Sequence, residues 1–288
     1  MKRELHEENR RAWNAATQAH NSHKGDQARY LREGGNTLFP DELELLGEPR
    51  GKRLLHLQCN SGQDTLSLAQ LGAVVTGVDI SDEAIGFAQR LSRDSGIPGT
   101  FVRADVFDYL EQTGAGTERF ELCFSSYGTL MWLSNLKAWA RGIASVLEPG
   151  GRLVVLDFHP FALVFDSKWV RDRPYFTGGK AFTEASGIGD YVERAKESLV
   201  PWGYEEGVRD FKNPHPSHEF GWGVGDLLTA VLEAGLVLEV FREYPYINGD
   251  PMYETMKDLP GRRKTTPEGM PNLPLMFGLA ARRPERSR

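Results

Sequence analysis

The chain contains 288 residues, of which 40% are apolar and 26% are charged, and its formal net charge is −6 at pH 7. This composition is typical of a globular protein with a sizeable core, and the negative charge argues against a broadly basic surface for nucleic acid. No segment approaches the roughly 20 apolar residues that span a membrane. The two cysteines predict neither a disulfide framework nor a zinc site, and we expect no metal. The charged N-terminal stretch lacks an apolar signal segment, so the expected location is the cytoplasm.

The first 50 residues predict a helical cap. Residues 4–19 and 41–46 have helical patterns, and a polar segment separates them. Trp13, His20 and Tyr30 could point from this cap into a ligand site. Alternatively, they could only pack the cap against the edge of a sheet.

The chain is organised around a predicted strand, turn and helix. An apolar strand at 53–57 is followed by the turn Cys59-Asn60-Ser61-Gly62 and by a helix over 64–71. A second apolar strand at 74–78 ends in Asp79, about 20 residues beyond the turn, as in nucleotide-binding βαβ units. A carboxylate at that position can accept hydrogen bonds from two ribose hydroxyls.

The alternation of strands and helices continues as far as residue 160. A helix is predicted over 82–92, a strand over 100–104 that leads into Asp105, and a strand over 121–125. A helix over 135–147 precedes the strand that ends in His159-Pro160. Successive parallel strands bring their carboxyl ends to one edge of the sheet, where ligands bind.

The number of glycines in the turn indicates whether the site could bind a dinucleotide. A dinucleotide site requires three glycines around the turn, whereas only Gly62 is present here and Gln58 and Asn60 replace the others. The sequence therefore argues against an NAD-dependent oxidoreductase, which stays an alternative.

Residues 51–160 resemble class I S-adenosylmethionine-dependent methyltransferases. The resemblance rests on the glycine-containing turn, on Asp79, on Asp105 and on the run Leu147-Glu148-Pro149-Gly150-Gly151. His56 departs from the family, which usually has an acid there. The resemblance implies S-adenosylmethionine as the cofactor and an α/β fold. The expected sheet is Rossmann-like, seven-stranded and mostly parallel, with an antiparallel last pair of strands.

The resemblance also implies a cofactor site. Asp79 would bind the ribose, and Asp105 would receive the adenine amino group. The residues expected to contact the cofactor are Trp13, Tyr30, Gln58, Asn60, Ser61, Gly62, Gln63, Asp64, Asp79, Ile80, Ala104, Asp105, Val106 and Ser125.

The second half of the chain departs from simple alternation. Residues 161–224 are rich in aromatic side chains and predict an insertion of short antiparallel strands over the acceptor pocket. A helix over 225–234 and strands over 236–244 and 273–281 follow, with a loop over 245–271. We expect a single domain composed of a cap (1–50), a cofactor-binding core (51–160), the insertion (161–224) and a final helix with two strands (225–288).

His159 is the first catalytic candidate. It closes the fifth strand on the edge that carries both predicted cofactor carboxylates, and its imidazole can exchange a proton near neutral pH. Asp157, two residues earlier, could orient this ring. The structural alternative is a histidine that anchors the insertion. His20 is the reserve candidate, and Tyr127, after the fourth strand, could line the acceptor pocket or pack in the core.

The sequence thus predicts methyl transfer to a nitrogen or oxygen of a small molecule, without a nucleic-acid or membrane partner. A second alternative is a protein that binds S-adenosylmethionine without turnover. Neither the acceptor's identity nor the oligomeric state has a signature in the sequence.

Overall fold

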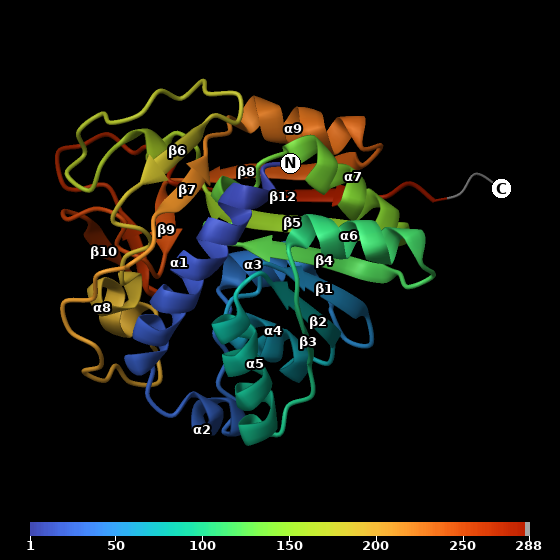
Figure 1. The fold of residues 1–288 in the computed structure, drawn as a ribbon, viewed down its shortest axis with the longest axis horizontal. Helices are drawn as coiled ribbons and strands as arrows, with labels where there is room; N and C mark the ends of the chain where they lie inside the picture. Colours follow the sequence, from blue (N-terminus) through green and yellow to red (C-terminus); the bar gives the residue numbers. More distant parts are fainter. Residues whose placement is uncertain (286–288) are drawn as a thin grey trace.

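A seven-stranded sheet forms the centre of the computed structural model, which describes residues 1–285. Its order is β3-β2-β1-β4-β5-β12-β8 (Figure 1). The strands β1 to β5 pair in parallel, and β12 runs antiparallel to both β5 and β8, which confirms the predicted architecture. The strands are β1 (Arg53–Leu57), β2 (Val74–Asp79), β3 (Thr100–Arg103), β4 (Phe120–Ser126), β5 (Leu147–Phe158), β8 (Val237–Tyr244) and β12 (Met276–Arg282).

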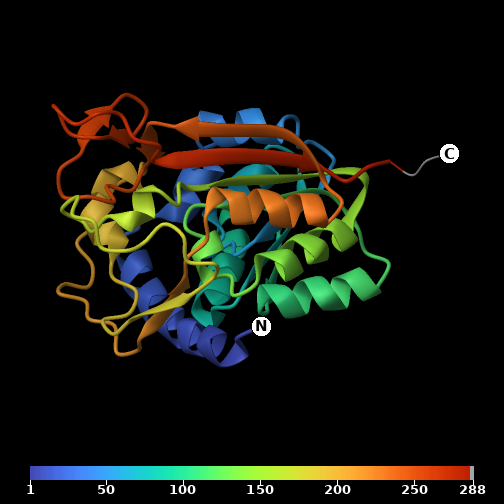
Figure 2. The ribbon, with the colours of Figure 1, turned by 90° about the horizontal axis from the view of Figure 1, so that it is seen from above.

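Helices cover both faces of this sheet (Figure 2). The helices α6, α7 and α9 share one apolar core with the sheet, and Trp139 and Ile143 of α7 are completely buried in it. Residues of α3 and α4 form the core on the other face. The helices are α1 (Arg3–Ser22), α2 (Gln27–Arg32), α3 (Pro40–Leu46), α4 (Gln63–Gln70), α5 (Asp82–Ser95), α6 (Val106–Ala115), α7 (Leu136–Val146), α8 (Tyr191–Ala195) and α9 (Val224–Glu233).

Three segments differ from the sequence prediction. The strand β5 begins at Leu147 and runs through the Glu148–Gly151 turn-like sequence, with an irregular register against β4. The helix α6 was not predicted. Residues 245–271, predicted as a loop, contain the three-stranded sheet of β9 (Tyr246–Asn248), β10 (Lys257–Leu259) and β11 (Arg263–Thr265). These strands are three residues long, too short to show a period-two pattern.

The N-terminal helix α1 packs against strand β7 (Ser217–Phe220) of the insertion. The insertion contains an antiparallel pair, β6 (Ala181–Glu184) and β7, and α1 lies beside β7 (Figure 1). Asn9 Nδ2 donates to the His218 carbonyl at 2.9 Å, and the His218 amide donates to Asn9 Oδ1 at 2.7 Å. We call this pair of hydrogen bonds the α1–β7 clasp.

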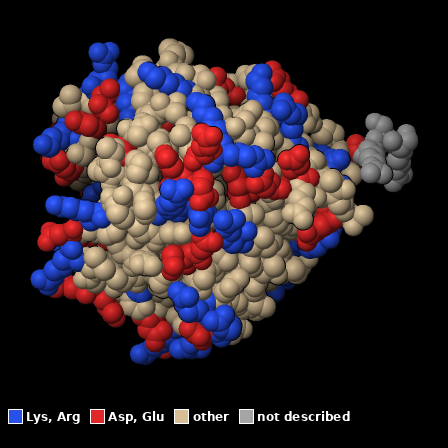
Figure 3. Space-filling model, viewed as in Figure 1, with Lys and Arg blue, Asp and Glu red and all other residues tan. Residues whose placement is uncertain are grey.

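The surface carries charges of both signs. On the face drawn in Figure 3, Lys and Arg side chains alternate with Asp and Glu, without a continuous basic stripe. Within residues 1–285, no helix combines the length and apolar character needed to cross a membrane.

His56, in the middle of β1, is buried between β2 and β4 and hydrogen-bonds Thr65 Oγ1 through Nδ1 at 2.8 Å. Burial lowers its pKa from 6.5 to about 3. Below pH 6.5 His56 is therefore protonated in the unfolded chain but stays neutral in the native state. The free energy of unfolding decreases as the pH falls from 6.5 toward the native pKa of about 3.

We predict that His56→Gln reduces the pH dependence of unfolding. Urea titrations should show that the free energy lost between about pH 7 and pH 4 is roughly 3 kcal/mol smaller in the variant than in the wild type. Other titrating groups contribute equally to both proteins. Parallel pH profiles would show that His56 is not the group responsible.

Candidate active site

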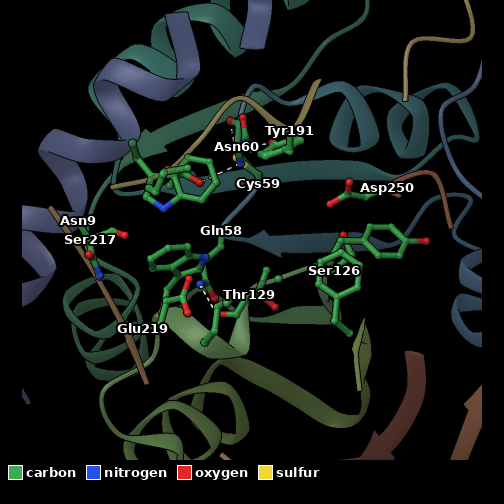
Figure 4. Close-up of a pocket in the computed structure, with 18 of the residues that line it drawn as sticks. Asn9, Gln58, Cys59, Asn60, Ser126, Thr129, Tyr191, Ser217, Glu219 and Asp250 are labelled. Atoms are coloured by element: carbon green, nitrogen blue, oxygen red, sulfur yellow. Dashed lines mark hydrogen bonds between the residues drawn. The ribbon is translucent and has the colours of Figure 1, made fainter. Parts of the chain in front are cut away.

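A cavity of about 610 Å³ opens at the carboxyl ends of β1 to β5 (Figure 4). This volume lies within the range of small-molecule sites. Asn9, Ser217 and Glu219 lie at one end of the cavity, and Asp250 lies at the other, with Gln58 between them (Figure 4). The sheet, the N-terminal cap and the insertion therefore all contribute walls.

The turn after β1 determines the floor of the cavity. Gln58, Asn60 and Gly62 all have left-handed backbone, with φ of 54°, 48° and 79°. Asn60 tolerates this conformation because its Oδ1 accepts the Ser61 amide at 2.7 Å. The side chain of Gln58 is fixed by donation from Nε2 to the Thr129 carbonyl at 2.9 Å. The two residues that replace the expected glycines thus retain the backbone that glycine would favour.

Gly62 cannot be replaced in the same way. A Cβ at this position would lie 2.7 Å from Ala88 Cβ and 2.8 Å from the ring of Phe101. Its left-handed φ adds a second restriction. Gly62 is also the N-cap of α4, so no side chain caps that helix.

Asp79, at the end of β2, is tied to the turn. Its Oδ2 accepts the Asn60 amide at 2.9 Å, and its Oδ1 accepts the Ser81 amide at 2.9 Å. Burial raises its pKa, although the amides of Ser81, Asn60 and Ile80 oppose this shift. A carboxylate has about four acceptor positions, so Asp79 can still accept hydrogen bonds from a ligand in the cavity.

Asp105, at the end of β3, has a partner that the sequence did not reveal. Its Oδ1 accepts the Phe107 amide at 2.9 Å, and its Oδ2 lies 2.7 Å from Nδ1 of His6. Burial alone would raise the pKa of Asp105, but His6, the Phe107 amide and Arg3 lower it below its usual value. The ring of His6 stacks on Phe107, so α1 supplies part of the wall beside Asp105.

Most of the residues predicted to bind the cofactor line the cavity: Trp13, Gln58, Asn60, Gln63, Asp64, Asp79, Ile80, Ala104, Asp105 and Val106. Four others support the wall instead. Ser61 accepts Asn21 Nδ2 at 2.8 Å, and Ser125 donates to Thr129 Oγ1 at 3.0 Å. Tyr30 donates to the Asn36 carbonyl, and Gly62 lies against Ala88 and Phe101.

The structure does not bring His159 to the cavity lining. Its Nδ1 accepts the Phe161 amide at 3.0 Å, and its Nε2 lies 2.9 Å from Glu243 Oε1. Burial lowers its pKa, while Glu243 opposes the shift. The catalytic role of His159 therefore stays a prediction without a contact to support it.

Asp157 does not orient His159, so that expectation was wrong. It is buried, and its Oδ2 accepts the amides of Thr129 and Leu130, each at 3.0 Å. Its Oδ1 accepts the Gly128 amide. Asp157 therefore holds the loop after β4, which forms one wall of the cavity.

His20 and Tyr127 occupy different positions. His20 is buried behind the lining, with Nε2 3.0 Å from the Gly189 carbonyl and its ring 4.0 Å from that of Tyr191. Burial lowers its pKa to about 4, so it is neutral at pH 7. Tyr127 lines the cavity and accepts Asn248 Nδ2 at 3.0 Å. Burial, followed by the nearby Glu42, raises the Tyr127 pKa well above its usual value, so its hydroxyl remains a donor.

Several lining residues escaped the sequence analysis because they belong to no motif. Asp250, after β9, faces the cavity (Figure 4), and both of its oxygens contact Arg194 Nη2, at 2.9 and 3.1 Å. Burial raises the pKa of Asp250, with Arg194 opposing the shift. Lys24 and Tyr191 reach the cavity from the cap and the insertion. Only the fold brings these distant segments together.

Comparison with known proteins shows which sequences this chain is similar to. Residues 54–151 match a family described as a methyltransferase domain. Among curated relatives, an uncharacterised methyltransferase of Synechocystis is 33% identical over 45% of this chain and 58% of its own length. A ubiquinone biosynthesis O-methyltransferase of Xanthomonas axonopodis is 32% identical over 41% of this chain and 49% of its own. The chain thus spans less than two thirds of these relatives.

Solved structures of methyltransferases have a fold similar to that of this chain. The crystal structure of an S-adenosylmethionine-dependent methyltransferase from Mesorhizobium loti aligns with a TM-score of 0.53 at 20% identity. The alignment covers 87% of this chain and 99% of that one. The strand order is that of a Rossmann-like fold. Residues 54–151 are similar to a methyltransferase domain, and the whole fold is similar to that of the Mesorhizobium loti structure.

We predict that Asp157→Asn destabilises the protein by about 2–4 kcal/mol, because a carboxamide would place a donor among backbone donors and remove a charge that satisfies them. Urea unfolding measures this loss. Asp166→Asn is a matched control, since Asp166 accepts the Lys168 and Val170 amides on the surface. The control should change stability by less than about 1 kcal/mol. Equal effects at both positions would contradict the structural role of Asp157.

Proposed function

We propose that the protein transfers a methyl group from S-adenosylmethionine to a nitrogen or oxygen of a small molecule. The observation that carries the proposal is the convergence of the left-handed turn, Asp79 and Asp105 in one cavity. The relative named as an O-methyltransferase supports oxygen as an acceptor atom.

The residues present fit this cofactor. Asp79 retains acceptor positions that suit two ribose hydroxyls, and Asp105 lies beside Val106, where an amino-bearing base can be recognised. We assign Gln58, Asn60, Gln63 and Asp64 to the remainder of the cofactor, with Trp13 and Ile80 against its apolar surfaces. Ala104 and Val106 complete this set, and Tyr30, Ser61, Gly62 and Ser125 support it from behind.

The cofactor supplies an activated methyl group, so the chain must align the acceptor, exclude water and remove a proton where the acceptor carries one. The cap and the insertion exclude water, because residues of both line the cavity above the sheet. The other end of the cavity provides apolar walls and the hydroxyl of Tyr127 for an acceptor. Its apolar residues there include Phe158, Phe165 and Met252.

Asp250 is our preferred base for the acceptor. It faces the cavity as a carboxylate paired with Arg194, and burial raises its pKa while Arg194 opposes the shift. Tyr127 would orient the acceptor as a hydrogen-bond donor. His159 and His20 lie outside the lining and are the second choices.

We predict that S-adenosylhomocysteine binds and NAD does not bind comparably, which calorimetry measures directly. Asp79→Ala should weaken S-adenosylhomocysteine by about 2 kcal/mol, the scale of hydrogen bonds lost from a charged group. Tight NAD binding without S-adenosylhomocysteine binding would overturn the cofactor assignment. An unchanged affinity in Asp79→Ala would remove that residue from the site.

Methyl transfer itself is tested with methyl-labelled S-adenosylmethionine and a small-molecule extract. Label should appear in a small molecule in the presence of the protein, and Asp79→Ala should incorporate less label when the cofactor concentration is limiting. Cofactor binding without any labelled product would favour the non-methylating alternative.

With the acceptor identified in that way, Asp250→Asn should slow turnover about 100-fold while S-adenosylhomocysteine affinity stays within about twofold. His159→Ala provides the comparison and should retain most activity. The opposite pattern would return catalysis to His159.

A further inference from the structure

Arg262 reaches the cavity from the turn of a hairpin. It follows Gly261 between β10 and β11, and both residues have left-handed backbone, with φ of 79° for Gly261 and 61° for Arg262. The Arg262 carbonyl accepts the Gly249 amide at 2.9 Å, which ties the turn to the end of β9. Left-handed backbone is unfavourable for a residue with a side chain, and such residues cluster at ligand-binding sites.

Three contacts fix the guanidinium group of Arg262 against the cavity wall. It lies over the ring of Phe39, with Cζ 4.2 Å from the ring centroid. Its Nη1 donates to the Ser198 carbonyl at 3.2 Å, and its Nη2 donates to the Thr37 carbonyl at 3.4 Å. A guanidinium group has about five N–H donors, so these two bonds leave donors for a ligand in the cavity.

Arg262 differs from the other arginines of the cavity in its charge partners. Arg173 is paired with Glu219, and Arg194 is paired with Asp250. Within residues 1–285, the half-buried Arg262 donates to carbonyl groups and forms no ion pair with a carboxylate. A positive charge that is partly removed from water is stabilised when a ligand supplies the missing anion.

The wall beside Arg262 leads to the place proposed for the acceptor. The Phe39 ring beneath the guanidinium group has its centroid 6.2 Å from that of the Tyr127 ring. The Tyr127 ring is 6.2 Å from that of Phe158, and all of these residues line the cavity. One small molecule can therefore place an anion at Arg262 and an apolar body against Tyr127 and Phe158.

Acidic neighbours limit the charge of this anion. Asp250 follows Gly249, whose amide is bonded to the Arg262 carbonyl. Burial raises the pKa of Asp64, and Arg262 is among the groups that oppose this shift, so Asp64 also lies within reach of its charge. A carboxylate carries one negative charge, which Arg262 balances, whereas a phosphate dianion would be repelled by both aspartates.

We propose that the acceptor is a carboxylic acid whose carboxylate binds Arg262, so that the methylated nitrogen or oxygen lies elsewhere in the molecule. This inference rests on the proposed function. Arg262 would donate two parallel hydrogen bonds to the carboxylate. An uncharged or cationic molecule of the same shape would leave the guanidinium group without an anion and would bind more weakly.

The wild-type protein tests the acceptor class directly. The product that is labelled from methyl-labelled S-adenosylmethionine in the small-molecule extract should couple to an amine with a carbodiimide, a reaction that requires a free carboxyl group. Mass spectrometry measures the coupling. A labelled product without a free carboxyl group would overturn the inference. The absence of any labelled product would instead overturn the proposed function.

Arg262→Met should raise the KM for this acceptor by about 10-fold to 100-fold, because two hydrogen bonds to a charged group are lost. Its affinity for S-adenosylhomocysteine in calorimetry should stay within about twofold, which also shows that the site is folded. Arg262→Lys should restore part of the loss. Arg90→Met is a matched control, since Arg90 lies over the Phe87 ring at 4.4 Å on α5, outside the cavity lining, and it should leave the KM unchanged.

The carboxamide of the acceptor separates recognition of the charge from damage to the fold. The wild-type protein should prefer the carboxylate by about 10-fold to 100-fold in kcat/KM, and Arg262→Met should lose most of this preference. An equal preference in both proteins would show that Arg262 does not bind the carboxylate. An Arg262→Met variant that weakens S-adenosylhomocysteine as much as the acceptor would assign Arg262 to the cofactor and would also overturn the inference.

Discussion

The backbone of the turn between β1 and α4 is the constraint on which the rest of the site depends. Three of its residues, Gln58, Asn60 and Gly62, have left-handed dihedral angles, and the Asn60 amide binds Asp79. Gly62 packs directly against Ala88 and Phe101, which leave no space for a side chain at this position. Longer side chains are accepted at two positions, because Gln58 donates to the Thr129 carbonyl and Asn60 accepts the amide of Ser61 within the turn. The turn therefore requires left-handed dihedral angles at Gln58 and Asn60, and at Gly62 it also requires the absence of a side chain.

The N-terminal cap supplies polar partners to carboxylates around the cavity. His6 of the cap contacts Asp105 at the end of β3, and Lys24 acts through space on Asp64 of α4 and Asp190 of the insertion. Without the cap the strand ends would present an acidic edge to water, and a polar ligand would lose its enclosing, low-dielectric surroundings.

The sequence predicted the parts of the protein that depend on local pattern. The strand β1, the helix α5 and the acids Asp79 and Asp105 follow from apolar periodicity and from positions at strand ends. Asp157 was misassigned because strand alternation gives the face of a side chain but not the loop that it reaches. Asp250 and Lys24 were missed because their positions depend on contacts between segments far apart in the chain. Such contacts leave no periodic trace.

The α1–β7 clasp can open before the central sheet unfolds. Its two backbone–side-chain hydrogen bonds are joined by the contact of Glu8 with His218 and of His6 with Phe220. These local contacts together are few compared with those that stabilise the sheet. The same helix carries Trp13 and His6, and the strand that it holds carries Ser217 and Glu219, all of which line the cavity. Separation of α1 from β7 would open this end of the cavity through a local fluctuation that leaves the sheet intact. Ligand exchange and global stability can then vary independently, so substitutions that loosen the clasp would speed release without melting the core.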